Sequence, residues 1–330
     1  MPDAGGRGVG AAPAMAEARP PGIRRSVLVF LDGVGVGLPD ALVNPTLAAE
    51  LPTLDGALGG RPTLVDARLV SSSGRGASAP LDACLGVDGT PQSGTGQAAL
   101  LTGTNAARAF GRHFGPWTPV ALRAMVARES LLAAARRRGL AVAFANAYPE
   151  ELLAAAGGPR PPMPLRAAPV IAARGADALT RTTAALAEGR AVASEITNAG
   201  WREHLGRTGL PDIDPAGAGR NLAAIVAGHD LTLFAHDSTD AAGHARDGPR
   251  AVAALERVDA FLGGLLAAVG EDVRIVVASD HGNIEDVRTG HTRNPALGLV
   301  LGPGAEAFAS RLASITDVAP RMLGELGVGG

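Results

Sequence analysis

Three acid–histidine signatures lie within about sixty residues of one another in this 330-residue chain, and they constrain its fold more than any other feature. They are Asp240 to His244 (DAAGH), Ser279 to Asn283 (SDHGN) and His291 to Pro295 (HTRNP). Apolar runs at 231–235 and 273–278 precede the first two, and such runs predict buried strands. The acids and histidines therefore fall where strands end, which is where ligands bind in an open α/β sheet. Carboxylates and imidazoles gathered there are typical of a metal site.

Composition and charge exclude several other classes of protein. A net charge of −2 and a pI near 6.4 provide no basic surface for nucleic acid or an anionic membrane. The single cysteine, Cys84, excludes an intrachain disulfide and a multi-cysteine zinc site. All 30 basic residues are arginine, which excludes the lysine of a phosphate-binding P-loop and a Schiff-base lysine. No apolar run approaches the roughly 18–20 residues of a membrane span, and residues 1–22 lack a secretory pattern, so we expect a cytoplasmic protein.

The first ordered element is expected to deliver another acid to the same sheet edge. The apolar run 26–31 predicts a buried strand, and Asp32 follows it directly. Glycines at 33, 35 and 37 allow the backbone to approach a ligand closely. They do not fit a dinucleotide fingerprint, because the glycine that opens the helix is missing and Pro39 would break that helix.

A serine stands where a long helix begins. The segment 91–103 (PQSGTGQAALLTG) runs from small residues into an Ala/Leu helix, which places Ser93 near the helix N-terminus. Free N–H groups and the helix dipole stabilise an anion there. One interpretation is a helix-capping serine; the other is a nucleophile whose phosphorylated form those N–H groups would hold.

Apolar periodicity elsewhere predicts alternating strands and helices. We expect further strands at 64–70, 140–146 and 297–301, and helices at 129–139, 215–228, 249–269 and from about residue 317. Residues 150–212 differ, because a proline-rich break (GGPRPPMP) precedes helical sequence without a strong strand. We therefore divide the chain into a disordered tail at 1–22, a core at 23–149 and 213–330, and a small helical insertion or lid at 150–212.

Charge supports a centre with two metal ions. Asp32, Asp240, Asp280 and an alkoxide at Ser93 sum to about −4, which would balance two divalent cations. Neutral imidazoles from three histidines would complete the ligand shells; these are His244, His281 and His291. Two metals about 3.5–4 Å apart can clamp the attacking and leaving oxygens of a phosphoryl displacement.

In their order along about 260 residues, these motifs resemble the alkaline phosphatase superfamily. Within it they are most similar to the metalloenzyme branch that holds cofactor-independent phosphoglycerate mutase and phosphopentomutase. The motifs are Asp32-Gly33, Ser93 to Gln97 (SGTGQ), Asp240 to His244, Asp280 to Asn283 (DHGN) and His291-Thr292. The resemblance implies a three-layer α/β/α core with a largely parallel central sheet, two Mn²⁺ or Zn²⁺ ions and a phosphorylated serine or threonine intermediate.

The resemblance also assigns roles to particular residues. It implies that one ion is held by Asp32, Ser93, Asp280 and His281, and the other by Asp240, His244 and His291. Ser93 takes the place of the family's nucleophile, with Thr95 as the fallback.

The chain departs from those mutases in two respects. It is too short for their large cap domain, which leaves only 150–212 to act as a lid, and a thin lid favours hydrolysis because a mutase must exclude water. Gln97 stands where these mutases usually have histidine. After the nucleophile helix, Arg108, Arg112 and His113 are candidates for binding a substrate phosphate or carboxylate, unless they form an ordinary solvated loop.

We therefore expect a two-metal phosphatase that acts on a small phosphorylated metabolite through a phosphoserine at Ser93. A phosphomutase that uses the same residues is the main alternative, and a phosphodiesterase or phosphonate hydrolase on the same core is a further variant. A catalytically silent metal-binding protein is the alternative from another class.

Overall fold

The computed structural model describes residues 22–157 and 161–328, so the tail predicted at 1–22 lies, apart from Gly22, outside the described residues. A six-stranded sheet in the order β2-β6-β5-β1-β4-β3 forms its centre. The strands are β1 (Arg25–Leu31), β2 (Gly76–Leu81), β3 (Val142–Phe144), β4 (Leu231–His236), β5 (Val273–Ser279) and β6 (Ala296–Leu301). The strands β3, β4, β1 and β5 are mutually parallel, and β6 pairs antiparallel with both β5 and β2. The sheet is therefore largely parallel, as predicted.

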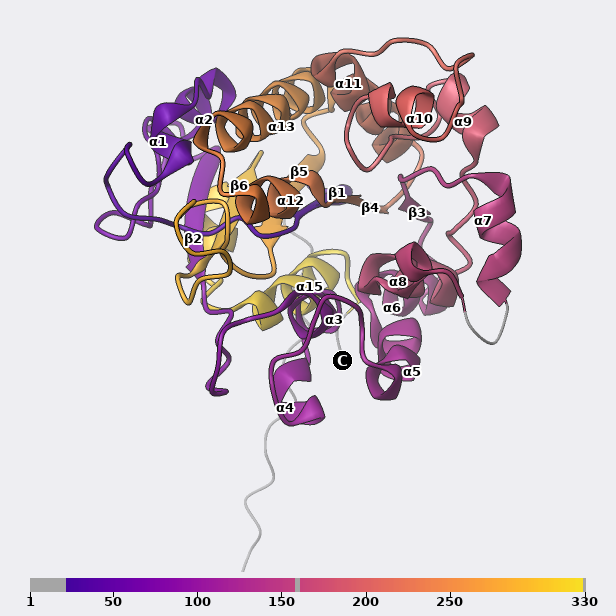
Figure 1. Cartoon of the computed structure of the whole chain (residues 1–330), viewed down its shortest axis with the longest axis horizontal. Helices are drawn as coiled ribbons and strands as arrows, with labels where there is room; N and C mark the ends of the chain where they lie inside the picture. Colours follow the sequence, from indigo (N-terminus) through magenta and orange to yellow (C-terminus); the bar gives the residue numbers. More distant parts are fainter. Residues whose placement is uncertain (1–21, 158–160, 329–330) are drawn as a thin grey trace, which may run out of the picture.

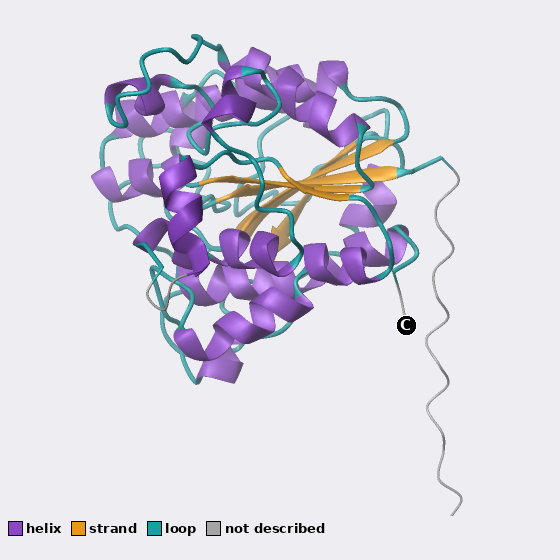
Figure 2. Ribbon diagram, turned by 90° about the vertical axis from the view of Figure 1, so that its right-hand side faces the viewer, coloured by secondary structure: helices purple, strands orange, loops and turns teal. Residues whose placement is uncertain are grey.

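Helices cover both faces of the sheet, which confirms the three-layer α/β/α fold (Figure 2). Along β1, Val27 and Val29 pack into the core on one face, and Leu28 and Phe30 into the core on the other. This alternation follows from the two-residue repeat of a strand, and because both faces are covered the strand is apolar from Val27 to Leu31.

One layer packs on the face of Val27 and contains α2 (Pro52–Leu58), α11 (Pro215–Ala227), α12 (Ser238–Ala245) and α13 (Gly248–Ala268). The opposite layer contains α3 (Ser93–Thr102), α5 (Val120–Glu129), α6 (Leu131–Arg137), α8 (Ala168–Gly175), α14 (Ala305–Ala309) and α15 (Ile315–Glu325). The shorter helices are α1 (Pro45–Ala48), α4 (Ala106–Phe110), α7 (Glu150–Ala154), α9 (Thr183–Ala187) and α10 (Ala199–Glu203) (Figure 1). Among the described residues, no helix combines the length and apolarity that crossing a bilayer requires.

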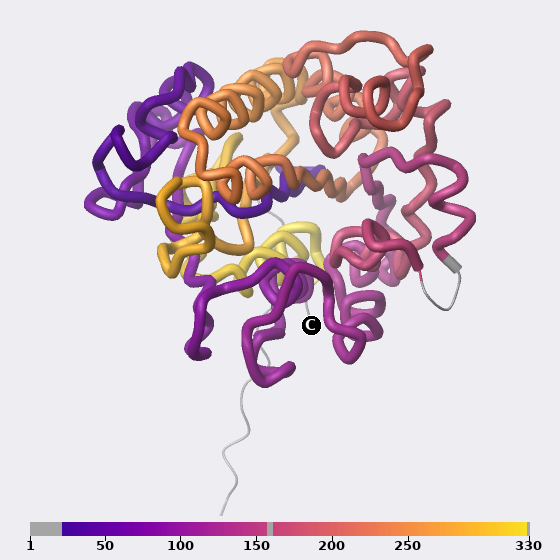
Figure 3. The backbone as a smooth tube through the Cα atoms, viewed as in Figure 1, coloured from indigo at the N-terminus to yellow at the C-terminus, as the bar shows by residue number. Residues whose placement is uncertain are grey.

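The sheet brings together segments that are far apart in the sequence. The N-terminal strand β1 lies between β4 and β5, and in Figure 3 its indigo trace runs among the orange segments of residues 231–279. Leu31 pairs with both His236 and Ser279, so the three strands end at the same height. The residues that follow these strands therefore emerge side by side at one edge.

The prediction of a strand at 64–70 is wrong. In this segment only Val70 pairs as a strand residue, through an isolated bridge to Ala77. Val65 is 80% exposed, which a buried strand would not allow. The true strand is β2, whose small residues carry a weak signal. Pro80 is tolerated there because β2 is an edge strand, where a missing N–H need not break the sheet.

Two further predicted boundaries differ from the structure. The helix predicted at 129–139 is in fact the end of α5 followed by α6, because Ser130 caps the end of one helix and the beginning of the other. The Ser130 Oγ accepts a hydrogen bond from the N–H of Ala133 at 3.4 Å. The strand predicted at 140–146 shortens to β3, and Asn146 beyond it bonds the backbone of Ala235 instead.

Segment 150–212 is mostly helical and contains α7 to α10 with two 3₁₀ turns at Ala155–Gly157 and Met163–Arg166. Its helix α8 contributes Ala168, Ile171 and Ala172 to the core beneath the sheet. A separate small cluster around Trp201 and Leu210 gathers α9 and α10. The division of the chain into core and lid stays a prediction, and α8 is a helix of the packed layer.

Candidate metal centre

Two parallel strands deliver the first ligand cluster. Asp32 follows β1, and Asp280 and His281 follow β5. The Nε2 atom of His281 lies 3.3 Å from Asp32 Oδ1 and 3.6 Å from Asp280 Oδ2. All three side chains are buried, and their ligand atoms lie within 4.8 Å of one another. Adjacent residues point to opposite faces of a strand, so the turn after Ser279 is what brings both Asp280 and His281 into the cluster.

The electrostatics of this cluster fit a bound cation. Asp32 Oδ1 and Asp280 Oδ2 are buried without a hydrogen-bond partner among the described residues. Burial, with the charge of Asp32, raises the pKa of Asp280 well above its ordinary value, and burial also raises the pKa of Asp32. Burial acts to lower the pKa of His281, but the charges of Asp280 and Asp32 outweigh it and raise that pKa to about 10. Buried carboxylates with free lone pairs are costly unless a cation neutralises them.

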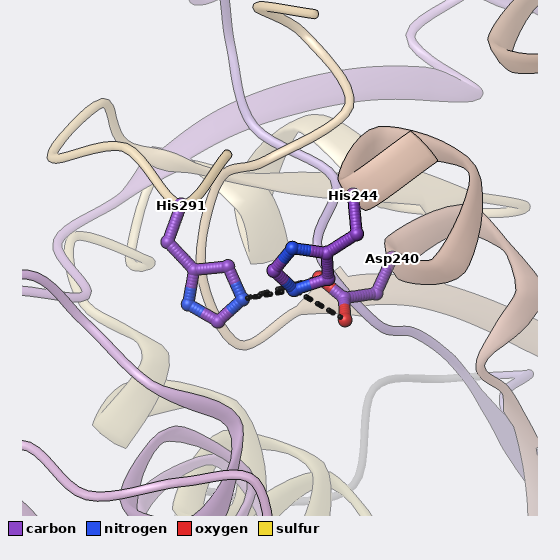
Figure 4. Close-up of side chains that lie close together, drawn as sticks. All are labelled: Asp240, His244 and His291. Carbon is purple, nitrogen blue, oxygen red and sulfur yellow. Dashed lines mark hydrogen bonds and ion pairs between the residues drawn. The ribbon is translucent and has the colours of Figure 1, made fainter. Parts of the chain in front are cut away.

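The second cluster is built on α12 and on the loop before β6. Asp240 and His244 lie one helical turn apart on α12, and His291 reaches them from the loop (Figure 4). His244 Nε2 lies 3.3 Å from Asp240 Oδ2 and 3.0 Å from His291 Nε2, which is itself 3.4 Å from Asp240 Oδ1. Burial would raise the pKa of Asp240, but His291, His281 and a hydrogen bond from Asn283 hold it below its ordinary value.

Backbone carbonyls set the orientation of the imidazoles. His291 Nδ1 lies 3.0 Å from the carbonyl oxygen of Pro91, and His281 Nδ1 lies 3.3 Å from that of Gly282. When each Nδ1–H donates to its carbonyl, the lone pair of Nε2 faces the carboxylates. That tautomer is the one a metal-binding histidine adopts.

The two clusters adjoin each other at Ser93. The rings of His281 and His291 are 4.0 Å apart between centroids, which makes the clusters neighbours. Ser93 is the first residue of α3, after Gln92 as the N-cap, and its Oγ lies 3.0 Å from His281 Nε2. The capping interpretation of Ser93 is therefore wrong. The hydroxyl of Thr95 instead donates to backbone carbonyls and accepts the N–H of Phe114 at 3.1 Å.

Close packing of the backbone allows the strand ends to converge. Gly33 adopts φ +68°, and a Cβ there would lie 2.6 Å from Asp240 Oδ1. The Gly33 N–H also donates to Asp280 Oδ1 at 3.3 Å. Only glycine adopts this positive φ without strain and also leaves room for the Asp240 side chain. Gly33 therefore allows the close approach of α12 to β1.

Two polar residues around the centre had no predicted role. Glu285 is fully buried, and its carboxylate accepts from the N–H groups of Gly35 and Asn283 and from the side chains of Thr292 and Asn294. Gln97, noted in the sequence only as a departure, donates from Nε2 to Asp32 Oδ2 at 2.8 Å. No local pattern separates Glu285 from its neighbour Asp286, which pairs with Arg288.

A cavity of about 440 Å³ opens beside the second cluster, and its lining includes Ser93, Asp240, His244 and His291. The predicted substrate-binding residues do not line it. His113 Nε2 contacts the carbonyl of Val87, Arg112 lies over the ring of Phe114, and Arg108 extends toward Gly86. The arginine that does line the cavity is Arg246, which sequence reasoning missed.

Sequence comparisons find similarity over part of the chain. The model of a family described as the metalloenzyme superfamily matches residues 214–329. A 2,3-bisphosphoglycerate-independent phosphoglycerate mutase of Paracoccus denitrificans is 37% identical over 123 residues, which is 34% of this chain and 24% of the relative. A second such mutase, from Methanothermobacter thermautotrophicus, is 35% identical over 104 residues, covering 31% of this chain and 26% of the relative. The match thus spans about a quarter of the length of these curated relatives.

Comparison of whole structures extends the similarity to nearly all of the chain. A protein from Pyrococcus horikoshii superposes with a TM-score of 0.56 at 14% identity, covering 93% of this chain and 98% of that one. The alkaline phosphatase of Thermus thermophilus gives 0.53 at 13% identity, with 93% and 92% covered. At such identities the likeness shows a shared fold. The family model, these partial relatives and the shared fold together support the alkaline phosphatase superfamily and, within it, the branch of the cofactor-independent phosphoglycerate mutases.

Proposed function

We propose that this protein is a two-metal phosphoryl-transfer enzyme that hydrolyses a small phosphorylated metabolite through a phosphoserine at Ser93. The observation that carries the proposal is the position of the Ser93 hydroxyl. It lies 3.0 Å from a ligand of the first cluster, at the start of a ten-residue helix, and it lines the cavity shared with the second cluster. A nucleophile, two ligand sets and space for a substrate thus meet at one point.

The residues present fit two divalent cations. Asp32, Asp280 and His281, with Ser93, would hold one, and Asp240, His244 and His291 the other. Mixed carboxylate and imidazole donors suit Mn²⁺ and Zn²⁺ alike. When bound, the ions would supply positive charge to the phosphoryl oxygens and to the leaving oxygen.

Ser93 would act as the nucleophile in two successive displacements. Its Oγ forms a bond to phosphorus while the bond from phosphorus to the ester oxygen breaks, which leaves a phosphoserine. The N-terminal end of α3 stabilises the added negative charge through its dipole and through first-turn N–H groups other than that of Thr95, which is bonded to the Phe114 carbonyl. Water then cleaves the bond between Ser93 Oγ and phosphorus and releases inorganic phosphate.

Access of water favours hydrolysis over isomerisation. The His244 side chain is 54% exposed, so solvent reaches the second cluster. The helix α8 of the segment predicted as a lid packs in the layer beneath the sheet. A mutase has to keep water away from the phosphoserine while the substrate turns or exchanges.

A phosphomutase is the second candidate, because the curated relatives matched over about a third of this chain are phosphoglycerate mutases. Product analysis separates the two reactions. A phosphatase yields inorganic phosphate and the free alcohol, whereas a mutase yields an isomeric ester and little free phosphate.

The test of the proposal is covalent labelling of the metal-loaded protein with a phosphomonoester, followed by mass spectrometry of the protein. We expect a phosphoryl adduct on Ser93 that Ser93→Ala abolishes, with the bound metal retained by the clusters of Asp and His. Thr95→Ser is the matched control and should still be labelled at Ser93. Labelling that persists in Ser93→Ala would reject Ser93 as nucleophile. Full metal loading without turnover of any phosphoester would favour a catalytically silent metal-binding protein.

A further inference from the structure

The cavity beside Ser93 and the second cluster is lined by a cationic side chain that the proposed chemistry does not use. Its volume of about 440 Å³ is in the range of small-ligand sites, and its lining includes Ser93, Asp240, His244, His291 and Arg246. Four of these belong to the nucleophile and the ligand sets. Arg246 belongs to neither, because an arginine does not bind a metal cation.

The backbone places Arg246 at the junction of two ligand-bearing segments. It caps α12 in the left-handed conformation, with φ 53° and ψ 38°, two residues after His244. Its Nη2 donates to the carbonyl oxygen of Thr289 at 3.2 Å, two residues before His291. The side chain therefore spans from α12 to the loop of His291 along the wall of the cavity.

Among the residues that the structure describes, the charge of Arg246 has no ion-pair partner. Within residues 22–157 and 161–328, no carboxylate forms an ion pair with Arg246, and the one hydrogen-bond partner of its side chain is the Thr289 carbonyl. The acid that lines the same cavity, Asp240, is engaged with His244, His291 and Asn283. A planar guanidinium with free N–H groups is suited to a carboxylate or phosphate, which it can bind through two hydrogen bonds.

We propose that Arg246 binds a second anionic group of the substrate, set apart from the phosphoryl group that reacts at Ser93. The inference rests on the proposed function, which places the reacting phosphoryl group between the clusters. It names the substrate class as a compact phosphomonoester with a further carboxylate or phosphate. Arg246 at the end of α12 then provides the specificity for such substrates, and Arg108 and Arg112, which the sequence suggested, do not contribute to it.

Binding measurements with matched ligands test this assignment. Calorimetry on the metal-loaded protein would compare phosphoglycolate and ethylene glycol bisphosphate with hydroxyethyl phosphate, which lacks the second anion. We expect the wild-type protein to bind one of the two doubly anionic ligands more tightly than hydroxyethyl phosphate. Tighter binding of phosphoglycolate would identify the second group as a carboxylate, and tighter binding of the bisphosphate would identify it as a phosphate. Arg246→Asn should weaken that ligand by about 10- to 100-fold, as loss of a charged hydrogen bond predicts, and leave hydroxyethyl phosphate nearly unchanged.

The choice of variants keeps the test decisive. Asparagine tolerates the left-handed conformation better than most residues, and Arg246→Lys keeps the charge while removing the planar fork. Arg112→Asn is the matched control and should not alter the preference. Equal weakening of all three ligands, or an unchanged preference in both Arg246→Asn and Arg246→Lys, would overturn the assignment. Wild type that binds the doubly anionic ligands but turns over no phosphomonoester would instead reject the proposed function and leave the role of Arg246 standing.

Discussion

The protonation of single residues determines when the centre can take up a cation. Although burial acts to lower the pKa of His281, the charges of Asp280 and Asp32 raise it to about 10. At neutral pH the imidazole therefore holds a proton until a cation displaces it, because the solution lies below this pKa. Metal affinity should consequently increase as the pH rises, since fewer protons then compete for the site.

Isothermal titration of Mn²⁺ or Zn²⁺ in buffers with different ionisation enthalpies checks this expectation. Between about pH 6 and 9 we expect proton release on binding and progressively tighter binding. His281→Gln, which cannot hold the proton, should release fewer protons and bind more weakly. Affinity that does not depend on pH, with no proton released, would contradict the argument.

Gln97 supports Asp32 by a single hydrogen bond of 2.8 Å from Nε2 to Oδ2. Gln97→Leu removes this donor inside a buried site, and loss of such support commonly weakens metal binding by about 10- to 100-fold. Gln97→His can still donate an N–H and should bind metal nearly as tightly as wild type. Competition with a chromogenic chelator measures both variants. If Gln97→Leu retained wild-type affinity, Asp32 would not need this support.

Glu285 connects three loops that each carry or adjoin a metal ligand. Its carboxylate accepts the Gly35 N–H at 3.0 Å, the Asn283 N–H at 2.7 Å and the Thr292 hydroxyl at 2.5 Å. Glu285→Gln would turn one acceptor oxygen into a donor that faces other donors. We expect it to displace the loops of Asp280 and His291 and to weaken metal binding about 10-fold or more.

Two measurements separate this positioning role from a general loss of stability. Thermal unfolding of Glu285→Gln in chelator reports the stability of the fold alone, and metal titration reports the ligand geometry. The exposed Glu203→Gln is the control and should change neither. A variant whose metal affinity equals that of wild type would refute the positioning role.

At the scale of elements, the site depends on how closely α3 approaches the loop after β5. A Cβ at Gly96, one turn into α3, would lie 2.9 Å from the carbonyl oxygen of Asp280 and 3.1 Å from its Cβ. Gly96→Ala should therefore push α3 and Asp280 apart, with a cost of roughly 1–3 kcal/mol typical of overpacking. We expect reduced metal affinity as well, because Ser93 and Asp280 lie on the two elements that separate.

Gly56→Ala in α2 is the matched control for this prediction. Apart from its chain neighbours and the backbone of its own helix, no atom lies within 4 Å of the position of its Cβ, so alanine should be neutral or stabilise the helix by up to about 1 kcal/mol. Thermal unfolding and metal titration of both variants give the comparison. Equal behaviour of the two alanine variants would show that α3 has room to move.

The ends of elements also explain how much of the site the sequence could predict. Asp32 and Asp280 follow long apolar strands whose signal is strong, and the four-residue spacing of Asp240 and His244 matches one turn of α12. By contrast β2 consists of small residues and a proline, so its pairing with β6 depends on tertiary contacts that no local pattern encodes. The role of Arg246 could not be predicted from the sequence either, because its left-handed backbone and its place on the cavity wall follow from how α12 ends.

At the scale of the whole molecule, the centre joins distant parts of the chain. Asp32 and Ser93 come from the N-terminal third, whereas Asp240 to His291 come from the C-terminal third, and the buried carboxylates repel one another until cations neutralise them. Bound metal should thus stabilise the native state against unfolding, by about 4 kcal/mol for each ion present at 1,000 times its Kd.

For a chain of this length, the stabilisation by both ions together corresponds to a rise in Tm of roughly 10 °C, which differential scanning calorimetry with and without chelator would measure. Asp240→Asn combined with His244→Ala dismantles only the second cluster and should retain part of the shift, because Asp32, Asp280 and His281 can still bind one ion. Removing Asp32 as well should eliminate the shift, since neither ligand set would then be complete. If chelation left the Tm of wild type unchanged while metal analysis showed full loading beforehand, the two halves of the site would be held together by the protein core alone.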